Sequence, residues 1–307
     1  MSNIDRLYAR LTDAGVDLDR LLRDEPMSRH TTFRVGGPAD LMLCANSGAE
    51  IACALKLARE EGVPAYVVGN GSNLLVRDGG IRGLVLRISG GLNAIRREGD
   101  CLLVQAGASL AAVAAFARDE GLSGMAELGG IPGTVGGGVL MNAGAYGAEL
   151  AQLVTQAEGV SLSDGRRVIY PADRLDFAYR HSALMDAGVV ITQATLALTP
   201  GDPEAIRARM EECAKARREK QPLTLPSAGS TFKRPEGHFA AKLIDDCGLR
   251  GLTVGGAQVS EKHAGFIVNI GGATARDMLE LMRQVEQRVF EQTGVQLEPE
   301  VRILGED

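Results

Sequence analysis

Three short polar segments of the chain carry side chains whose types could do chemistry. They are Tyr-Arg-His-Ser at 179–182, Ala-Gly-Ser-Thr-Phe-Lys-Arg-Pro at 228–235 and Pro-Glu-Val-Arg at 299–302. They supply a guanidinium at Arg180, a hydroxyl at Ser230 and a carboxyl at Glu300. Each also has an ordinary explanation, as a surface ion-pair partner, a turn residue and an edge-strand charge respectively. No Gly-x-Ser-x-Gly elbow surrounds Ser230, so the sequence does not favour a hydrolase triad.

A glycine-rich stretch that precedes these three segments in the chain predicts a ligand cradle. It runs over 129–138 and continues through Asn-Ala-Gly-Ala-Tyr-Gly at 142–147. Glycine loses more backbone freedom on ordering than other residues, so a dense cluster indicates backbone that must approach a phosphate or a flat ring. The interleaved Ile131, Val135 and Val139 argue against a mobile surface loop.

A second glycine turn indicates the same kind of ligand. The apolar run 65–68 reads as a buried strand, and Gly-Asn-Gly-Ser-Asn at 69–73 ends it abruptly. Glycine and asparagine both tolerate positive φ, so successive N–H groups can form one concavity that suits a pyrophosphate. Leu74 stands where a dinucleotide-binding fingerprint has its third glycine, and no Gly-Lys-Ser/Thr follows, so neither the Rossmann motif nor a P-loop is present.

The elements that position these segments alternate between short strands and helices. We expect helices over 4–22, 50–61, 109–117, 134–141, 204–220, 239–244 and from Thr274 onward. We expect strands over 31–33, 41–43, 65–68, 84–88, 102–106, 154–162, 167–170, 189–198, 265–270 and 295–304. The fold class is therefore α+β, and Thr-Pro-Gly-Asp-Pro at 199–203 places the main domain boundary near residue 200.

Composition excludes several classes of partner and site. A net charge of −6 argues against nucleic acid, and no long uncharged apolar run indicates a membrane span. The five cysteines are widely spaced without a Cys-x-x-Cys pair, so we expect neither a disulfide framework nor a metal site. The N-terminus has no signal pattern, so we expect a cytoplasmic protein.

Seven motifs in fixed order resemble the UDP-N-acetylenolpyruvoylglucosamine reductase (UDP-N-acetylmuramate dehydrogenase) family, from about residue 30 to the C-terminus. They lie at 31–39, 69–75, 129–137, 142–147, 179–182, 228–235 and 299–302. The resemblance implies a vanillyl-alcohol-oxidase-type (PCMH) FAD-binding domain over 1–200, with subdomains of about 1–68 and 69–200, and a substrate-binding domain over 201–307. No extra loop follows Arg180, so the chain is similar to the shorter subtype, which lacks a tyrosine loop insertion.

The resemblance also implies the cofactor and its contacts. FAD would bind with its pyrophosphate on the 69–73 loop and its flavin against 129–137, without a covalent tether because neither loop holds His or Cys. The implied contacts are Gly69, Asn70, Gly71, Ser72, Asn73, Leu74, Gly130, Ile131, Pro132, Gly133, Thr134, Gly136, Gly137, Asn142, Ala143 and Arg302. NADPH would be the reductant. His30 stands where the family often has Asn, and we expect a structural role there.

In the implied reaction, reduced FAD gives hydride to the vinyl carbon of UDP-N-acetylglucosamine enolpyruvate, a small-molecule substrate. By motif position Ser230 donates the proton, and Arg180 and Glu300 polarise the substrate carboxylate. Four further side chains are candidates for binding the substrate: Tyr179, Lys220, Lys233 and Arg234. We expect a monomer. Two alternatives stay open at this point, an FAD-dependent alcohol oxidase of the same superfamily and a non-catalytic FAD- or nucleotide-binding protein.

Overall fold

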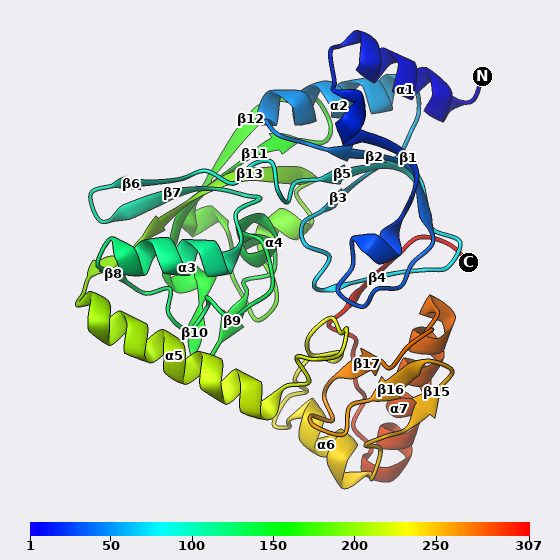
Figure 1. Cartoon of the computed structure of the whole chain (residues 1–307), viewed down its shortest axis with the longest axis vertical. Helices are drawn as coiled ribbons and strands as arrows, with labels where there is room; N and C mark the ends of the chain where they lie inside the picture. Colours follow the sequence, from blue (N-terminus) through cyan, green and yellow to red (C-terminus); the bar gives the residue numbers. More distant parts are fainter. The chain divides into compact units, whose positions relative to one another are not determined.

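The computed structural model describes all 307 residues, and most of its helices and strands are labelled in Figure 1. Its helices are α1 (Asn3–Asp13), α2 (Gly48–Glu60), α3 (Leu110–Asp119), α4 (Val135–Leu140), α5 (Pro203–Lys220), α6 (Ala240–Asp246) and α7 (Ala275–Thr293). Its longer strands are β1 (Leu21–Pro26), β2 (Pro38–Cys44), β3 (Ala65–Val68), β5 (Ile81–Arg87), β6 (Ile95–Glu98), β7 (Cys101–Gln105), β11 (Val154–Ser161), β12 (Arg167–Pro171) and β13 (Val189–Ala197). Its shorter strands are β4 (Leu74–Val76), β8 (Leu122–Ser123), β9 (Gly144–Ala145), β10 (Ala148–Glu149), β14 (Thr199–Pro200), β15 (Thr253–Val254), β16 (Ala257–Val259), β17 (Ile267–Asn269) and β18 (Arg302–Leu304).

The chain forms two compact units, each assembled from three separate segments. Unit 1 contains Met1–Arg23, Leu41–Asn70 and Gly83–Ala216. Unit 2 contains Asp24–Asp40, Gly71–Arg82 and Arg217–Asp307. These units differ from the predicted ranges 1–200 and 201–307, because two N-terminal segments pack with the C-terminal one. Composition along the chain carries no trace of such long-range association.

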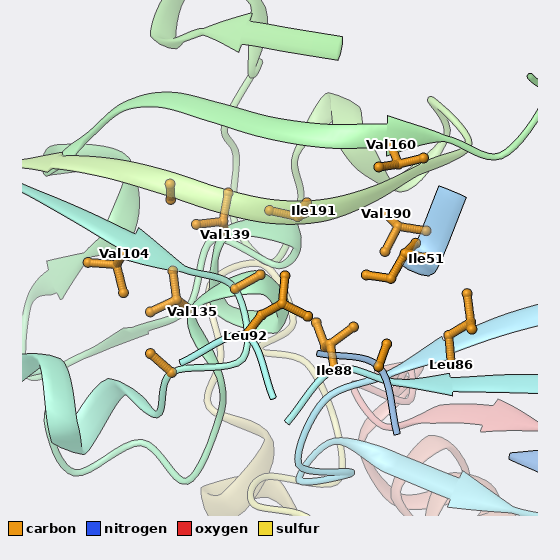
Figure 2. Close-up of a cluster of buried hydrophobic side chains, with 14 of the residues drawn as sticks. Ile51, Leu86, Ile88, Leu92, Val104, Val135, Val139, Val160, Val190 and Ile191 are labelled. Carbon is orange, nitrogen blue, oxygen red and sulfur yellow. The ribbon is translucent and has the colours of Figure 1, made fainter. Parts of the chain in front are cut away.

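Unit 1 is built around a five-stranded sheet with the strand order β12-β11-β13-β7-β6, in which all neighbours are antiparallel. The helix α4 packs on β13 and β7. Figure 2 shows Val135 and Val139 of α4 among the buried side chains of this core, together with Val104 and Ile191. Burial of this apolar surface fixes the glycine-rich segment, of which α4 is part, as a packed element of the domain.

Unit 2 contains a three-stranded antiparallel sheet of β15, β16 and β17, with α7 packed on β15 and β16. The apolar face predicted for the last helix is buried, with Met278, Leu281 and Val285 each 0 % exposed. A parallel pair joins β4 to β18, so Leu74 lies opposite Arg302. This pairing explains why the segment Gly71–Arg82 belongs to the C-terminal unit.

Most predicted elements are present, and their local signals are visible in the structure. The hydroxyls of Ser109, Thr134 and Thr274 accept hydrogen bonds from backbone N–H groups in the first turns of α3, α4 and α7. The predicted hairpin over 154–170 is formed by β11 and β12, which pair antiparallel. A separate four-stranded sheet has the order β1-β2-β5-β3, with β3 and β5 parallel.

Three predicted elements are wrong in extent or type. The helix expected over 4–22 ends at Asp13, Gly15 adopts φ +86°, and Leu21 begins β1. The strand expected at 31–33 is a turn, because the Thr31 hydroxyl donates to the Val35 carbonyl at 2.8 Å. The strand expected over 295–304 is reduced to β18. Strands β1, β4, β6, β8, β9, β10, β14, β15 and β16 were not predicted.

Asp78 fastens the Gly71–Arg82 segment to α7 inside unit 2. Its carboxylate accepts hydrogen bonds from the N–H groups of Ala275 (2.8 Å) and Arg276 (2.9 Å), the first two residues of that helix. We predict that Asp78→Ala lowers the free energy of unfolding by about 1 kcal/mol, as loss of a helix cap does. Urea denaturation would measure it. Asp78→Asn, which keeps one acceptor oxygen, should lose less, and an unchanged midpoint for Asp78→Ala would contradict the prediction.

Candidate active site

The two predicted cofactor loops touch within unit 1, although they are 60 residues apart in the chain. A Cβ atom added at Gly69 would lie 2.6 Å from the hydroxyl oxygen of Thr134, the N-cap of α4. The Asn70 side-chain amide donates to the Pro132 carbonyl at 3.5 Å, and the Ser89 hydroxyl donates to the Gly69 carbonyl at 3.1 Å. The structure therefore brings Gly69 and Asn70 beside the 130–134 stretch, as one shared cradle requires.

Not every predicted cofactor residue is accessible. Gly130, Pro132 and Gly137 are exposed, whereas Thr134 is 1 % exposed. Asn142 is also 1 % exposed, and its side chain bonds only to protein groups. A contact between Asn142 and a cofactor would therefore have to come from its backbone.

The rest of the first loop lies in unit 2, next to two predicted residues from the C-terminus. The Asn73 amide donates to the Glu300 carbonyl at 3.0 Å, and the Asn73 carbonyl accepts from the Arg302 N–H at 3.0 Å. Gly71 adopts φ +61°, and its carbonyl accepts from the Thr32 N–H at 3.2 Å. Residues 71–74, Glu300 and Arg302 thus form one local arrangement, although more than 220 positions separate the two segments.

Ser230 projects from a loop that is fastened on one side to the Glu300 segment. Its neighbour Thr231 is fully buried, and the Thr231 carbonyl accepts the Glu300 N–H at 2.8 Å. The Thr231 hydroxyl also accepts the Ile267 N–H at 3.0 Å, at the start of β17. The Ser230 residue itself is exposed. The structure therefore brings Ser230 and Glu300 to adjacent backbone positions, with the serine facing solvent.

Arg180 lies in unit 1, at the tip of a two-residue turn. Ala178 and His181 bracket the turn by exchanging two backbone hydrogen bonds of 3.1 Å. Arg180 adopts φ +55°, and its guanidinium carbon lies 5.0 Å from the ring centroid of Tyr179. Tyr179 is 47 % exposed. The turn thus presents a planar cation and an aromatic ring together, a pair suited to a carboxylate-bearing ligand.

A pocket of about 480 Å³ in unit 2 includes one of the predicted substrate residues, Lys220. Lys233 and Arg234 do not line it. Lys233 instead pairs with Glu298 at 3.2 Å, and the Arg234 guanidinium lies over the exposed ring of Phe239 at 4.6 Å from its centroid. The structure therefore separates Lys220 from the other two predicted cations.

The pocket adds four basic side chains that the sequence analysis missed: Lys242, Arg250, Lys262 and His263. Two of them have acidic partners, since Lys242 pairs with Asp246 at 2.8 Å and Arg250 with Asp245 at 2.5 Å. The hydrogen bond that Arg250 donates to Asp245 raises the pKa of Arg250, and the one that Lys242 donates to Asp246 raises the pKa of Lys242.

Burial lowers the pKa of His263, so its ring is neutral at neutral pH and the positive charge comes from the lysines and the arginine. Together with Lys220, the four added residues are spread over more than 40 positions of the chain, and no local motif marks them.

Comparisons with known proteins decide the family. A family model for the C-terminal domain of UDP-N-acetylenolpyruvoylglucosamine reductase matches residues 221–304, and one for an FAD binding domain matches 39–169. UDP-N-acetylenolpyruvoylglucosamine reductase of Clostridium botulinum (strain Hall) is 47 % identical over 289 residues, covering 94 % of each chain. The chain belongs to the UDP-N-acetylenolpyruvoylglucosamine reductase family. The family's enzyme from Clostridium beijerinckii is 48 % identical over 300 residues, covering 98 % of each chain.

A solved structure of the same family confirms the fold. The crystal structure of the Thermus caldophilus enzyme matches with a TM-score of 0.79 at 38 % identity, covering 93 % of this chain and 98 % of that one. A berberine bridge enzyme variant matches with a TM-score of 0.51 at 15 % identity over 63 % of this chain and 43 % of that one, which shows the fold alone. The predicted α+β fold with an FAD-binding domain is confirmed, and so is FAD as the cofactor.

Two further findings bear on the site and its surroundings. No helix combines the length and the apolar character needed to cross a membrane. No group of three or more His, Cys, Asp or Glu side chains is arranged to hold a metal ion.

Proposed function

We propose that this protein reduces the enolpyruvyl group of UDP-N-acetylglucosamine enolpyruvate to give UDP-N-acetylmuramate, a step of peptidoglycan precursor synthesis, with FAD as cofactor and NADPH as reductant. Family membership over nearly the whole chain supports the activity. The structural observation that best supports the proposal is the hydrogen bond from the Glu300 N–H to the Thr231 carbonyl. Because Thr231 follows Ser230, this bond brings the proposed proton donor close to the proposed catalytic glutamate. The alcohol oxidase alternative is not favoured, since the relatives are named as reductases.

The residues present fit FAD. A Cβ atom at Gly71 would lie 2.0 Å from the His30 carbonyl oxygen, so this turn tolerates only glycine and keeps its backbone bare. The ring of His30 bonds to Glu25 through Nε2 at 2.8 Å, while its Nδ1 is buried with no hydrogen-bond partner. A buried ring nitrogen without a partner is costly unless a ligand or water group completes it.

We assign the predicted residues of 69–74 and 130–137, together with Ala143 and Arg302, to the holding of this cofactor. FAD, when bound, supplies the hydride that the vinyl carbon of the substrate receives. Thr134 and Ile131 would act through the shape of their segment, because Thr134 is buried as a helix cap and Ile131 packs against the core of unit 1.

The side chains of this protein supply the proton and the charge. Arg180 would hold the substrate carboxylate by its planar fork of N–H donors. The Glu300 side chain would polarise the substrate carboxylate, which stabilises negative charge as it develops. Ser230 would then deliver its hydroxyl proton to the carbon next to that carboxylate, which completes the reduction of the double bond. A serine hydroxyl is a very weak acid, so it donates only to a strong base formed beside it.

The sugar nucleotide would place its diphosphate at the pocket lined by Lys220. We predict that Lys220→Ala raises the KM for the enolpyruvyl substrate by roughly 10- to 100-fold, the worth of one hydrogen bond to a charged group, with a smaller change in kcat. Steady-state kinetics would measure it. Lys56→Ala removes an exposed lysine of α2 and should leave KM unchanged. An unchanged KM for Lys220→Ala would contradict the assignment.

We assign Tyr179 to the substrate through its contact with Arg180, and we also assign Lys233 and Arg234 to substrate binding. We further propose that the protein acts in the cytoplasm as a monomer. Equilibrium sedimentation would give one chain mass of 32.4 kDa if this is right, and a multiple of it if it is wrong.

Product analysis tests the activity directly. Purified protein with FAD, NADPH and the enolpyruvyl sugar nucleotide, kept free of oxygen, should convert the substrate to a product two hydrogen atoms heavier. NADPH consumption should equal product formation. Consumption that occurs only in the presence of oxygen, without change of the sugar nucleotide, would favour an oxidase instead.

A further inference from the structure

The turn that carries Arg180 is short. It contains two residues between Ala178 and His181, of which Tyr179 is exposed and Arg180 is half-buried. Arg180 has φ +55°, a left-handed conformation that residues with a Cβ adopt only where their surroundings enforce it. Bonds to the neighbouring chain on each side of the tip contribute to holding this geometry.

Asn142 anchors the turn on the side before its tip. Its amide Nδ2 donates to the Ala178 carbonyl at 3.1 Å and to Glu149 Oε2 at 3.0 Å. Its Oδ1 accepts the Ala151 N–H at 2.9 Å. Both amide hydrogens and the carbonyl oxygen are thus engaged by protein groups in a site that is 1 % exposed. A buried amide with this many bonds fixes the position of each of its partners.

Ser182 anchors the turn on the side after its tip. Its hydroxyl donates to the Leu140 carbonyl at 2.7 Å, and the residue is 0 % exposed. Leu140 is the last residue of α4, and Asn142 lies two positions further along. Both sides of the Arg180 turn are therefore fastened to the same short piece of chain, where the glycine-rich segment leaves α4.

We propose that Asn142 and Ser182 are positioning residues that hold Arg180 in place for the substrate carboxylate. This rests on the proposed function, which gives Arg180 its role. It also changes the expected role of Asn142, whose side chain serves the arginine turn and not the cofactor. Because Asn142 follows α4 closely and Ser182 bonds to the last residue of α4, the position of Arg180 depends on the end of the glycine-rich helix.

If Ser182 only stabilised the fold, its replacement would have the same effect whether or not Arg180 is present. A double-mutant cycle distinguishes this role from the positioning of Arg180. Ser182→Ala removes one hydroxyl from an anchor, and Arg180→Ala removes the side chain that the anchor positions. A displacement of the order of 1 Å can cost about 100-fold in rate, so we expect Ser182→Ala to slow reoxidation of the reduced enzyme by the enolpyruvyl substrate by about 10- to 100-fold. In the Arg180→Ala background, the same change should alter that rate less than about two-fold. Reduction by NADPH should be unaffected in every variant.

Asn142→Gly provides a second variant, since glycine accepts the φ of +45° found there. It should slow reoxidation similarly while the apoprotein keeps its affinity for added FAD. Thr293→Ala is the matched control, because it removes a 2.7 Å hydroxyl-to-carbonyl bond at the end of α7 and should lower thermal stability without changing either half-reaction.

The outcomes are distinct. Equal loss from Ser182→Ala in both backgrounds, or no loss in the wild-type background, would overturn the proposal. So would an Asn142→Gly protein that loses FAD affinity yet reoxidises normally once loaded. If Arg180→Ala alone leaves reoxidation unchanged, the role of Arg180 in the proposed function fails, and that result is separate from the anchoring.

Discussion

Replacing Ser230 with alanine is expected to slow reoxidation of the reduced enzyme by its substrate by about 100- to 10,000-fold, the usual worth of a positioned proton donor. Reduction by NADPH should proceed at the wild-type rate, because that step needs no proton from this side chain. The physical reason is local, since the exposed Ser230 stands beside the buried Thr231, whose carbonyl holds the Glu300 backbone. Stopped-flow absorbance at the flavin band measures the two half-reactions separately.

The control for this change lies in the same loop. Ser227→Ala, three positions earlier, alters a half-buried serine whose backbone forms a bridge with Val268, and it should leave both rates unchanged. If Ser230→Ala and Ser227→Ala reoxidise equally fast, Ser230 is not the proton donor. Equal slowing of both half-reactions by Ser230→Ala would indicate a disturbed loop instead of a lost proton.

Replacing Gly71 with alanine is expected to give a colourless protein. The new Cβ would lie 2.0 Å from the His30 carbonyl oxygen and 2.9 Å from the Thr31 Cα, and backbone atoms cannot yield as a flexible side chain can. The turn must open, which breaks the bond from the Thr32 N–H to the Gly71 carbonyl. We predict that FAD affinity falls by at least about 100-fold, since this corresponds to only about 2.7 kcal/mol.

The variant Gly99→Ala distinguishes the effect of a left-handed backbone from the effect of a steric clash. Gly99 has φ +62°, almost identical to the +61° of Gly71, but a Cβ added there meets nothing within 4 Å. This variant should lose about 1 kcal/mol of stability from the left-handed backbone alone and should keep its flavin. Titration of each apoprotein with FAD provides the comparison. Wild-type FAD affinity in Gly71→Ala would show that the 69–73 turn does not hold the cofactor.

The sequence predicted elements well where the signal is local. Thr274 followed by Asp277 forms a capping box, and the apolar positions of α7 repeat at helical spacing, so this helix could be placed before its surroundings were known. Strand β13, which the apolar run at 189–198 predicted, is present over Val189–Ala197. The cap at Thr134 likewise marked α4 inside a stretch that glycine content alone would class as loop.

The failures occur where tertiary contacts override local preference. Leu18, Leu21 and Leu22 continue the helical spacing of α1, yet Leu21 begins strand β1 because it pairs within a sheet. The bonds from Asp78 to α7 join residues 197 positions apart, and no local pattern encodes them. The assembly of unit 2 from three segments likewise depends on long-range contacts.

The residues of the candidate site also fall into two groups, those that local sequence signals reveal and those that only the fold brings together. The glycine loops could be found because backbone that approaches a ligand needs a residue type that is visible in the sequence. Pocket residues such as Arg250 and His263 could not, because a lone cation or histidine resembles any surface residue until the fold gathers several together. Asn142 was recognised as special, but only the structure shows that its side chain bonds to the turn carrying Arg180.

One measurement tests the central claim most directly. The purified protein, loaded with FAD and free of oxygen, is mixed with one equivalent of NADPH and then with the enolpyruvyl sugar nucleotide, and its visible spectrum is followed. We predict that the flavin absorbance bleaches with NADPH and returns fully when the sugar nucleotide is added, with one molecule of UDP-N-acetylmuramate formed per flavin. A spectrum that stays bleached with this substrate and recovers only when oxygen is admitted would contradict the account.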